Sequence, residues 1–379
     1  MTPFAISAPT RILFGRGEAA RAHALIRGLG ARILIVHGNN SARADWLIRG
    51  LAGAGAEMQM YACGGEPTLA MLTHALRHTT GFEPEVVVGL GGGAVLDLAK
   101  ALAALIPSPT GVLDHLEIVG RGLPLTVPPL PFVAIPTTAG TGAEATKNAV
   151  IGLPDHGRKV SLRDDRMVAR LAIIDPALTD NCPRAITLAS GLDAITQVIE
   201  PYLSRRATLY TDALTRPAIA EGTTALIRLM QAEDAAARDQ MAWVSLRGGL
   251  ALANGGLGAV HGLAGVIGGM TGAPHGALCG VLLGPVLAMH RQTLPATSPA
   301  AARLAEVNAI IATAFGTATV DALSAWAKSC GLPNLVQMGL QTSAHSEVAK
   351  ASLSSSSMQG NPVLPSTADL VQVLQQASI

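Results

Sequence analysis

The chain has few aromatic residues, few charged residues and few cysteines, and each scarcity excludes a class of protein. Aromatic residues make up 3% of its 379 residues and charged residues 14%, whereas 49% are hydrophobic. So apolar a composition excludes intrinsic disorder and predicts a core built mainly from Ala, Leu, Ile and Val. A chain of this length exceeds what one hydrophobic core usually serves, so we expect two domains.

The charge balance gives no field that would attract a polyanion. The formal net charge is +1, and no run of Lys and Arg with interleaved aromatic residues is present. Nucleic-acid binding is therefore not expected.

Cysteine usage and the amino terminus both point to the cytoplasm. The four cysteines lie far apart without a CxxC pair, which is typical of reduced thiols rather than of a disulfide framework. The first 20 residues lack the basic start and apolar run of a signal peptide. The most apolar stretch, residues 257–290, is interrupted by Pro274, Pro285, glycines and three histidines, so we expect no membrane span.

Strand-like and helix-like segments alternate through the first half of the chain. Apolar runs predict strands, and the segments between them have helical spacing and glycine-rich ends. The predicted strands are residues 31–38, 56–62, 84–93, 132–136 and 170–176, and the predicted helices are residues 41–55 and 66–81. This rhythm predicts an α/β domain with a parallel sheet. From about Pro183 only helical periods remain, so we place an α/β domain at residues 1–183 and an all-α domain at residues 184–379.

Two turns at strand ends suit a dinucleotide. Gly91, Gly92 and Gly93 join a strand to a helix, where side-chain-free residues and the free N–H groups of the helix start favour a pyrophosphate. The stretch IPTTAGTGAE (135–144) follows another strand and offers three hydroxyl groups, those of Thr137, Thr138 and Thr141. The carboxyl ends of parallel strands share one edge of a sheet, so both turns are expected to line one site. Tight connections and ordinary polar loops remain the alternative.

The end of the first predicted strand bears on the choice between NAD(H) and NADP(H). A carboxylate there would select the free 2′-hydroxyl of NAD, but Gly38 supplies none, and Asn39 and Arg43 could contact a 2′-phosphate. The sequence favours NADP(H), with a solvent-exposed role for Arg43 as the alternative.

Four residues of the helical half could hold a divalent metal. Asp193 and Gln197 are four residues apart and share one helix face. His261 lies in an apolar helix candidate and His275 follows a Gly/Pro breaker, which lets the chain fold back and bring the two imidazoles together. A lone histidine in such a helix is more often a core residue, but two beside this acid and amide favour a metal site.

Long motifs of this chain resemble those of the iron-containing (group III) alcohol dehydrogenases, with the metal-independent maleylacetate reductases as near relatives. The matching stretches include GGGAVLDLAKALA (91–103), PTTAGTGAEATKNAVI (136–151), GLDAITQVIEPY (191–202) and AVHGLAGVIGGMTGAPHG (259–276). The resemblance implies a dinucleotide-binding α/β domain, an all-helical domain as in the dehydroquinate-synthase-like fold, and an active-site cleft between them. It also implies a homodimer and NAD(P)-dependent hydride transfer between an alcohol and an aldehyde or ketone.

The resemblance assigns roles to single residues. It implies that Gly91, Gly92, Gly93, Asp97, Thr137, Thr138, Thr141 and Lys159 bind the cofactor. The strand end discussed above adds Gly38 and Asn39 to these residues, and in the mechanism that we expect His261 and His275 act in catalysis. Asp193, His261 and His275 match three of four ligands for Fe²⁺ or Zn²⁺.

Two residues depart from the family pattern. The fourth ligand, normally histidine, is Gln197, and a histidine often found near the nicotinamide is Gly265. An amide oxygen is a harder donor than imidazole, so these departures leave metal retention open. A metal-independent oxo-acid reductase and a non-catalytic nucleotide-binding protein are the alternatives.

Overall fold

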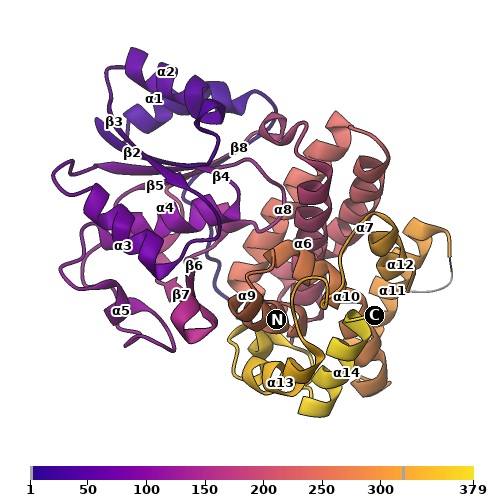
Figure 1. Ribbon diagram of the computed structural model, residues 1–379. Helices are drawn as coiled ribbons and strands as arrows, with labels where there is room; N and C mark the ends of the chain where they lie inside the picture. Colours follow the sequence, from indigo (N-terminus) through magenta and orange to yellow (C-terminus); the bar gives the residue numbers. More distant parts are fainter. Residues whose placement is uncertain (1–2, 318–320) are drawn as a thin grey trace. The chain divides into compact units, whose positions relative to one another are not determined.

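The computed structural model describes residues 3–317 and 321–379, and its chain divides into two compact units (Figure 1). The sheet unit comprises Ser7–Thr138 and Ala143–Asp180. The helical unit comprises Asn181–Ile379, the first residues up to Ile6, and the short stretch Ala139–Gly142. Separate domains at residues 1–183 and 184–379 remain a prediction.

A six-stranded parallel sheet forms the centre of the sheet unit. Its strand order is β3-β2-β4-β5-β8-β1, and every neighbouring pair is parallel. The strands are β1 (Ile12–Phe14), β2 (Arg32–Gly38), β3 (Glu57–Cys63), β4 (Val86–Gly91), β5 (Phe132–Pro136) and β8 (Leu171–Ile174). The predicted parallel α/β domain is confirmed.

Helices cover both faces of the sheet, which explains why β4, β5 and β8 are buried at every position. Successive side chains of a strand point to opposite faces. Leu34 and Val36 accordingly join the core beneath α3 and α4, whereas Ile33 and Ile35 join the core beneath α1 and α2 (Figure 1). The helices of this unit are α1 (Ala22–Arg27), α2 (Asp45–Gly53), α3 (Leu69–His78), α4 (Gly93–Leu105) and α5 (Val112–His115).

The strand order places the predicted cofactor turns at one point of the sheet. After β2 the chain adds β3 on one side, and it then crosses over so that β4 lies on the other side of β2. The connections after β2 and β4 therefore leave the same edge in opposite directions, which is where open α/β sheets bind ligands. The turn after β5 is next in line, because β5 pairs with β4.

Sequence periodicity did not predict β1 or the antiparallel hairpin that the sheet unit also contains. β6 (Asn148–Leu153) pairs with β7 (Arg158–Arg163), and Gly157 closes the turn with φ +55°. Both strands alternate between more and less buried residues, as in a strand with one packed face.

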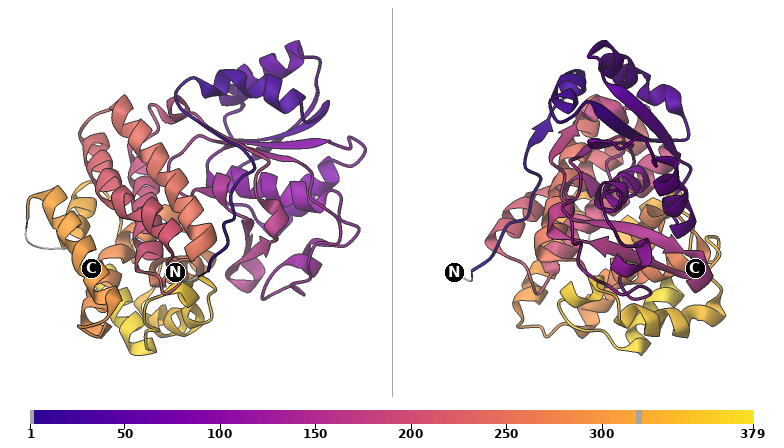
Figure 2. Two further views of the ribbon diagram at one scale, coloured as in Figure 1. Left: turned by 180° about the vertical axis from the view of Figure 1, so that it is seen from behind. Right: turned by 90° about the vertical axis from the view of Figure 1, so that its left-hand side faces the viewer.

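Long helices pack side by side in the helical unit (Figures 1 and 2). Side-chain caps begin several of them: Thr208 accepts from the Thr211 N–H and Asp234 from the Ala237 N–H. The helices are α6 (Arg184–Leu203), α7 (Leu209–Gln231), α8 (Ala235–Gly255), α9 (Ala259–Thr271), α10 (His275–Thr293), α11 (Pro299–Phe315), α12 (Asp321–Ser329), α13 (His345–Leu353) and α14 (Thr367–Ala377). Across the described residues, no single helix has the length and apolarity of a membrane span, although α8 and α9, bent by 98°, pass that test as a pair.

Candidate active site

Helix α6 presents three polar side chains on one buried face. Asp193, Gln197 and Glu200 are spaced by four and three residues, so they follow one another along a single side of the helix. Their exposed fractions are 1%, 2% and 6%. Three polar groups this deeply buried need partners, and neighbouring helices supply only some of them.

The two predicted histidines meet, as the glycine and proline breaker between them allows. α9 ends at Thr271 and is capped by Gly272, whose φ of +69° is the left-handed conformation that terminates a helix, and α10 begins at His275. The chain reverses there, so that the ring centroids of His261 and His275 lie 5.4 Å apart. The start of α10 also sits tightly on α6, since a Cβ at Gly276 would approach Ala189 O to 2.5 Å.

A fourth side chain, which the sequence analysis did not include, completes the cluster. One ligand atom each from Asp193, His261, His275 and Cys279 lies within 4.8 Å of all the others. Cys279 is one helical turn beyond His275 and fully buried, with its Sγ 3.6 Å from His275 Nε2. Cys279 follows His275 by four residues, the same spacing that places Asp193 and Gln197 on one helix face. This spacing is the signal in the sequence that could have predicted Cys279 as a member of the cluster.

Glu200 orients His261. Its Oε2 lies 2.6 Å from His261 Nδ1, and its Oε1 accepts the Val260 N–H at 2.7 Å. A carboxylate accepts hydrogen bonds, so His261 carries its proton on Nδ1 and directs the lone pair of Nε2 into the cluster. Gly258 permits this arrangement, because a Cβ there would come within 2.9 Å of Glu200 Oε1.

The donor atoms fit a bound cation. His261 Nε2 and Asp193 Oδ1 are 3.3 Å apart without forming a hydrogen bond, and they are buried without another partner among the described residues. Gln197 Nε2 donates to Gly140 O at 3.3 Å, whereas its buried Oε1 lacks a partner in the described ranges. Two lone pairs facing each other at this distance repel unless a proton or a metal ion lies between them.

The same closeness shifts the pKa values of the cluster when no metal is bound. Burial lowers the pKa of His275, but the sulfur of Cys279 and the Asp193 carboxylate more than offset this effect and bring it to about 9. Burial likewise opposes the charge on His261, yet Cys279, Asp193 and Glu200 raise its pKa well above its usual value. Protons thus occupy, in the metal-free chain, positions that a metal would take.

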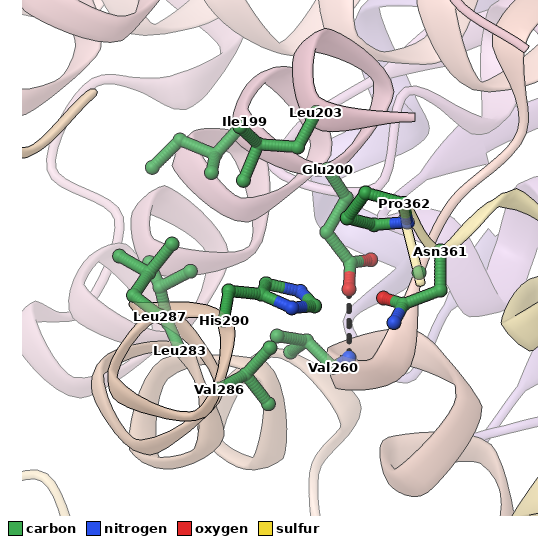
Figure 3. Close-up of a pocket in the computed structure, with 11 residues that line it drawn as sticks. Ile199, Glu200, Leu203, Val260, Leu283, Val286, Leu287, His290, Asn361 and Pro362 are labelled. Atoms are coloured by element: carbon green, nitrogen blue, oxygen red, sulfur yellow. Dashed lines mark hydrogen bonds between the residues drawn. The ribbon is translucent and has the colours of Figure 1, made fainter. Parts of the chain in front are cut away.

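A small pocket lies against the other side of Glu200 (Figure 3). Val286, His290 and Asn361 line it, and the figure shows the hydrogen bond from Val260 to Glu200. Burial lowers the pKa of His290 to about 4, more than the nearby Glu200 raises it. His290 is therefore neutral at pH 7 and leaves the Glu200 charge available to His261.

In the sheet unit, the predicted glycine turn is built for close approach. Gly92 precedes the first turn of α4, where the backbone N–H groups point away from the strand. A Cβ on Gly91 would lie 2.5 Å from Val95 Cγ2, so the tight strand-to-helix turn requires glycine. Thr137 N–H donates to Gly91 O at 2.9 Å, which joins the two predicted turns.

The other predicted cofactor residues lie in several places. Gly38 is the last residue of β2, and Asn39, which follows it, donates from Nδ2 to Gly64 O. Thr137 and Thr138 belong to the sheet unit, whereas Thr141 lies in the stretch that packs with the helical unit. There, a Cβ at Gly142 would meet Gly249 Cα at 2.5 Å, so this glycine serves close packing onto α8.

Two further predicted residues make contacts within the sheet unit. Asp97 Oδ2 accepts the Val150 N–H at 3.1 Å and joins α4 to β6, and Lys159 forms an ion pair with Glu66. Beside Asp97, the buried Lys100 donates to Ala143 O, Thr146 Oγ1 and Asn148 O, which holds the segment after the threonine turn.

Comparison with protein families matches both units. Residues 9–176 match the family "Iron-containing alcohol dehydrogenase", and residues 187–378 match "Fe-containing alcohol dehydrogenase family, C-terminal". The chain is 32% identical over 302 residues to a Bacillus methanolicus protein, "NAD-dependent methanol dehydrogenase", covering 77% of each chain. The protein belongs to the iron-containing alcohol dehydrogenase family.

Other relatives and solved structures agree with this assignment. "Probable alcohol dehydrogenase EutG" of Escherichia coli (strain K12) is 35% identical over 65% of this chain, and the match spans 62% of that relative's length. "Lactaldehyde reductase" of the same strain is 31% identical over 82% of this chain and 81% of its own. The structure of "Alcohol dehydrogenase from Oenococcus oeni" superposes with a TM-score of 0.86 at 25% identity, covering 99% of this chain and 100% of that one.

Proposed function

We propose that the protein is an NAD(P)-dependent oxidoreductase that interconverts an alcohol and an aldehyde or ketone. One observation carries the proposal: buried acceptor atoms of Asp193, Gln197 and His261 without hydrogen-bond partners in the described chain, in a protein of the iron-containing alcohol dehydrogenase family. Relatives whose names specify methanol and lactaldehyde support a small alcohol or carbonyl compound as the substrate.

In this proposal the sheet unit binds the dinucleotide. The N–H groups at the start of α4 and the glycines before it receive the pyrophosphate. The residues that we assign to cofactor binding are Gly38, Asn39, Gly91, Gly92, Gly93, Asp97, Thr137, Thr138, Thr141 and Lys159. The cofactor supplies or accepts the hydride.

The helical unit holds the metal and the substrate oxygen. Asp193, Gln197, His261 and His275 are the ligands that the sequence predicts for Fe²⁺ or Zn²⁺. Bound there, the ion supplies Lewis-acid stabilisation of the negative charge that develops on the substrate oxygen. Glu200 accepts the proton of His261 Nδ1 and so leaves Nε2 as the atom that would bind the metal, and the burial of the cluster excludes water that would weaken these electrostatic interactions. We further propose a cytoplasmic homodimer.

Oxidation of NADH and NADPH by a panel of short aldehydes, ketones and oxo-acids tests the proposal. We expect loss of the reduced-cofactor absorbance with aldehydes or ketones, its abolition by a chelator, and its recovery on adding Fe²⁺ or Zn²⁺. Asp193→Asn should lower kcat/KM at least about 100-fold, because it removes the charged ligand. Asp155→Asn, the same change at an exposed residue, is the control and should leave kcat/KM unchanged. Turnover of oxo-acids alone, unaffected by demonstrated metal removal, would contradict the proposal.

A further inference from the structure

Cys279 has the position of a metal ligand rather than of an ordinary core cysteine. In a tetrahedral zinc site with Zn–N near 2.05 Å and Zn–S near 2.3 Å, a nitrogen and a sulfur ligand lie about 3.6 Å apart, and a nitrogen and an oxygen about 3.35 Å apart. The observed separations are 3.6 Å between Cys279 Sγ and His275 Nε2, and 3.3 Å between His261 Nε2 and Asp193 Oδ1. Both equal the separations expected between ligands of a tetrahedral zinc ion, and the four ligand atoms all lie within 4.8 Å of one another.

Unpartnered atoms point to the same ion independently of the cysteine. Asp193 Oδ1 and His261 Nε2 are buried and make no hydrogen bond in the described part of the chain. The sulfur joins these atoms from a third helix, since Asp193 is on α6, His261 on α9 and Cys279 on α10.

We propose that the Cys279 thiolate is a direct ligand of the metal, in the place of the imidazole that Gln197 does not provide. The inference rests on the metal centre of the proposed function, and it deepens that function by assigning the centre's ligand chemistry. The charges of Asp193 and Cys279 together equal that of a dication, so the metal and its direct ligands carry no net charge. Thiolate is a soft ligand and therefore shifts the preference of the site from Fe²⁺ toward Zn²⁺. Gln197 contributes at most an additional, weaker oxygen.

X-ray absorption at the zinc edge of the zinc-loaded full chain tests the proposal without any substitution. One sulfur at about 2.3 Å from each zinc is the expected result, beside nitrogen and oxygen at about 2.0 to 2.1 Å. A shell of nitrogen and oxygen alone, on protein holding one zinc, would overturn the proposal. So would a chain that binds no zinc.

A pair of serine variants assigns the sulfur. Cys279→Ser should remove the sulfur shell and raise the dissociation constant for zinc at least about 100-fold, because a first ligand matters at least as much as its outer-shell partners. Cys330→Ser, the same exchange outside the cluster, should retain both the sulfur shell and the affinity. Loss of the sulfur shell in the control, or its retention in Cys279→Ser, contradicts the assignment. Should Cys279→Ser fail to fold, the cobalt-loaded wild type gives a second measurement, in which a sulfur-to-cobalt charge-transfer band is expected and its absence refutes the proposal.

These spectra separate the inference from the proposed function. A sulfur shell without turnover of any alcohol or carbonyl compound would leave the ligand assignment standing while the function fails. Turnover of an alcohol or carbonyl compound without a sulfur shell would leave the proposed function standing while the ligand assignment fails.

Discussion

Replacing Glu200 by glutamine preserves the size of a buried side chain but changes which hydrogen bonds it can accept. Glu200 accepts from two donors, His261 Nδ1–H at 2.6 Å and the Val260 N–H at 2.7 Å. A glutamine has one acceptor oxygen, so its NH₂ group must face one of these donors. If the NH₂ group faces His261, Nδ1 must accept its hydrogen bond. The neutral imidazole then carries its proton on Nε2, the atom that would bind the metal. If it faces Val260, two buried donors oppose each other.

Either arrangement should weaken metal binding, because both remove the carboxylate charge that faces His261 Nδ1. A hydrogen bond to a charged group contributes about 1.5 to 3 kcal/mol. Since 1.4 kcal/mol corresponds to about tenfold in affinity, we expect the dissociation constant for zinc to rise about 10- to 100-fold. Competition with a chromophoric chelator measures this constant, and NMR of the histidine ring nitrogens reports which nitrogen of His261 carries the proton.

Glu347→Gln is the matched control, because Glu347 is an exposed carboxylate on α13 and the same change there should leave zinc affinity unaltered. A Glu200→Gln protein that folds, binds zinc as tightly as the wild type and keeps His261 protonated on Nδ1 would refute the reasoning.

Three further predictions concern the cofactor, pH and stability. Gly38→Asp should raise the ratio of kcat/KM with NADH to that with NADPH by about tenfold or more, because a carboxylate there repels a 2′-phosphate. The new side chain has room, since no described atom lies within 4 Å of an added Cβ. An unchanged ratio contradicts the assignment of this strand end. For His290, a folded pKa of about 4 against 6.5 unfolded means that the unfolded chain binds more protons between these values, so stability is fully present above pH 6.5 and falls by up to about 3 kcal/mol toward pH 4. Urea unfolding of metal-free wild type and His290→Leu should show this difference in slope, and parallel pH profiles would contradict it. Lys100→Met should lower the free energy of unfolding by at least about 3 kcal/mol, because it removes the three hydrogen bonds that a fully buried ammonium group donates. The loss of an exposed lysine in Lys350→Met should have little effect, and equal urea midpoints would reject the packing argument.

Local pattern was enough to predict the architecture of the sheet unit. The apolar run at residues 31–38 contains β2, and the glycine-ended run at residues 84–93 contains β4, because a strand buried on both faces is apolar along most of its length. The hairpin of β6 and β7 escaped prediction, since strands of six residues leave only a short alternating signal.

The candidate metal cluster shows where sequence reasoning ends. Spacing by itself placed Asp193 and Gln197 on one helix face, and the Gly/Pro breaker predicted that His261 and His275 could meet. The partnership of Glu200 with His261, and the approach of Cys279 to both histidines, were decided only by the packing of α6, α9 and α10. Periodicity describes which side of a helix a residue occupies, whereas contact between helices depends on how closely their backbones approach, as Gly258 and Gly276 allow here.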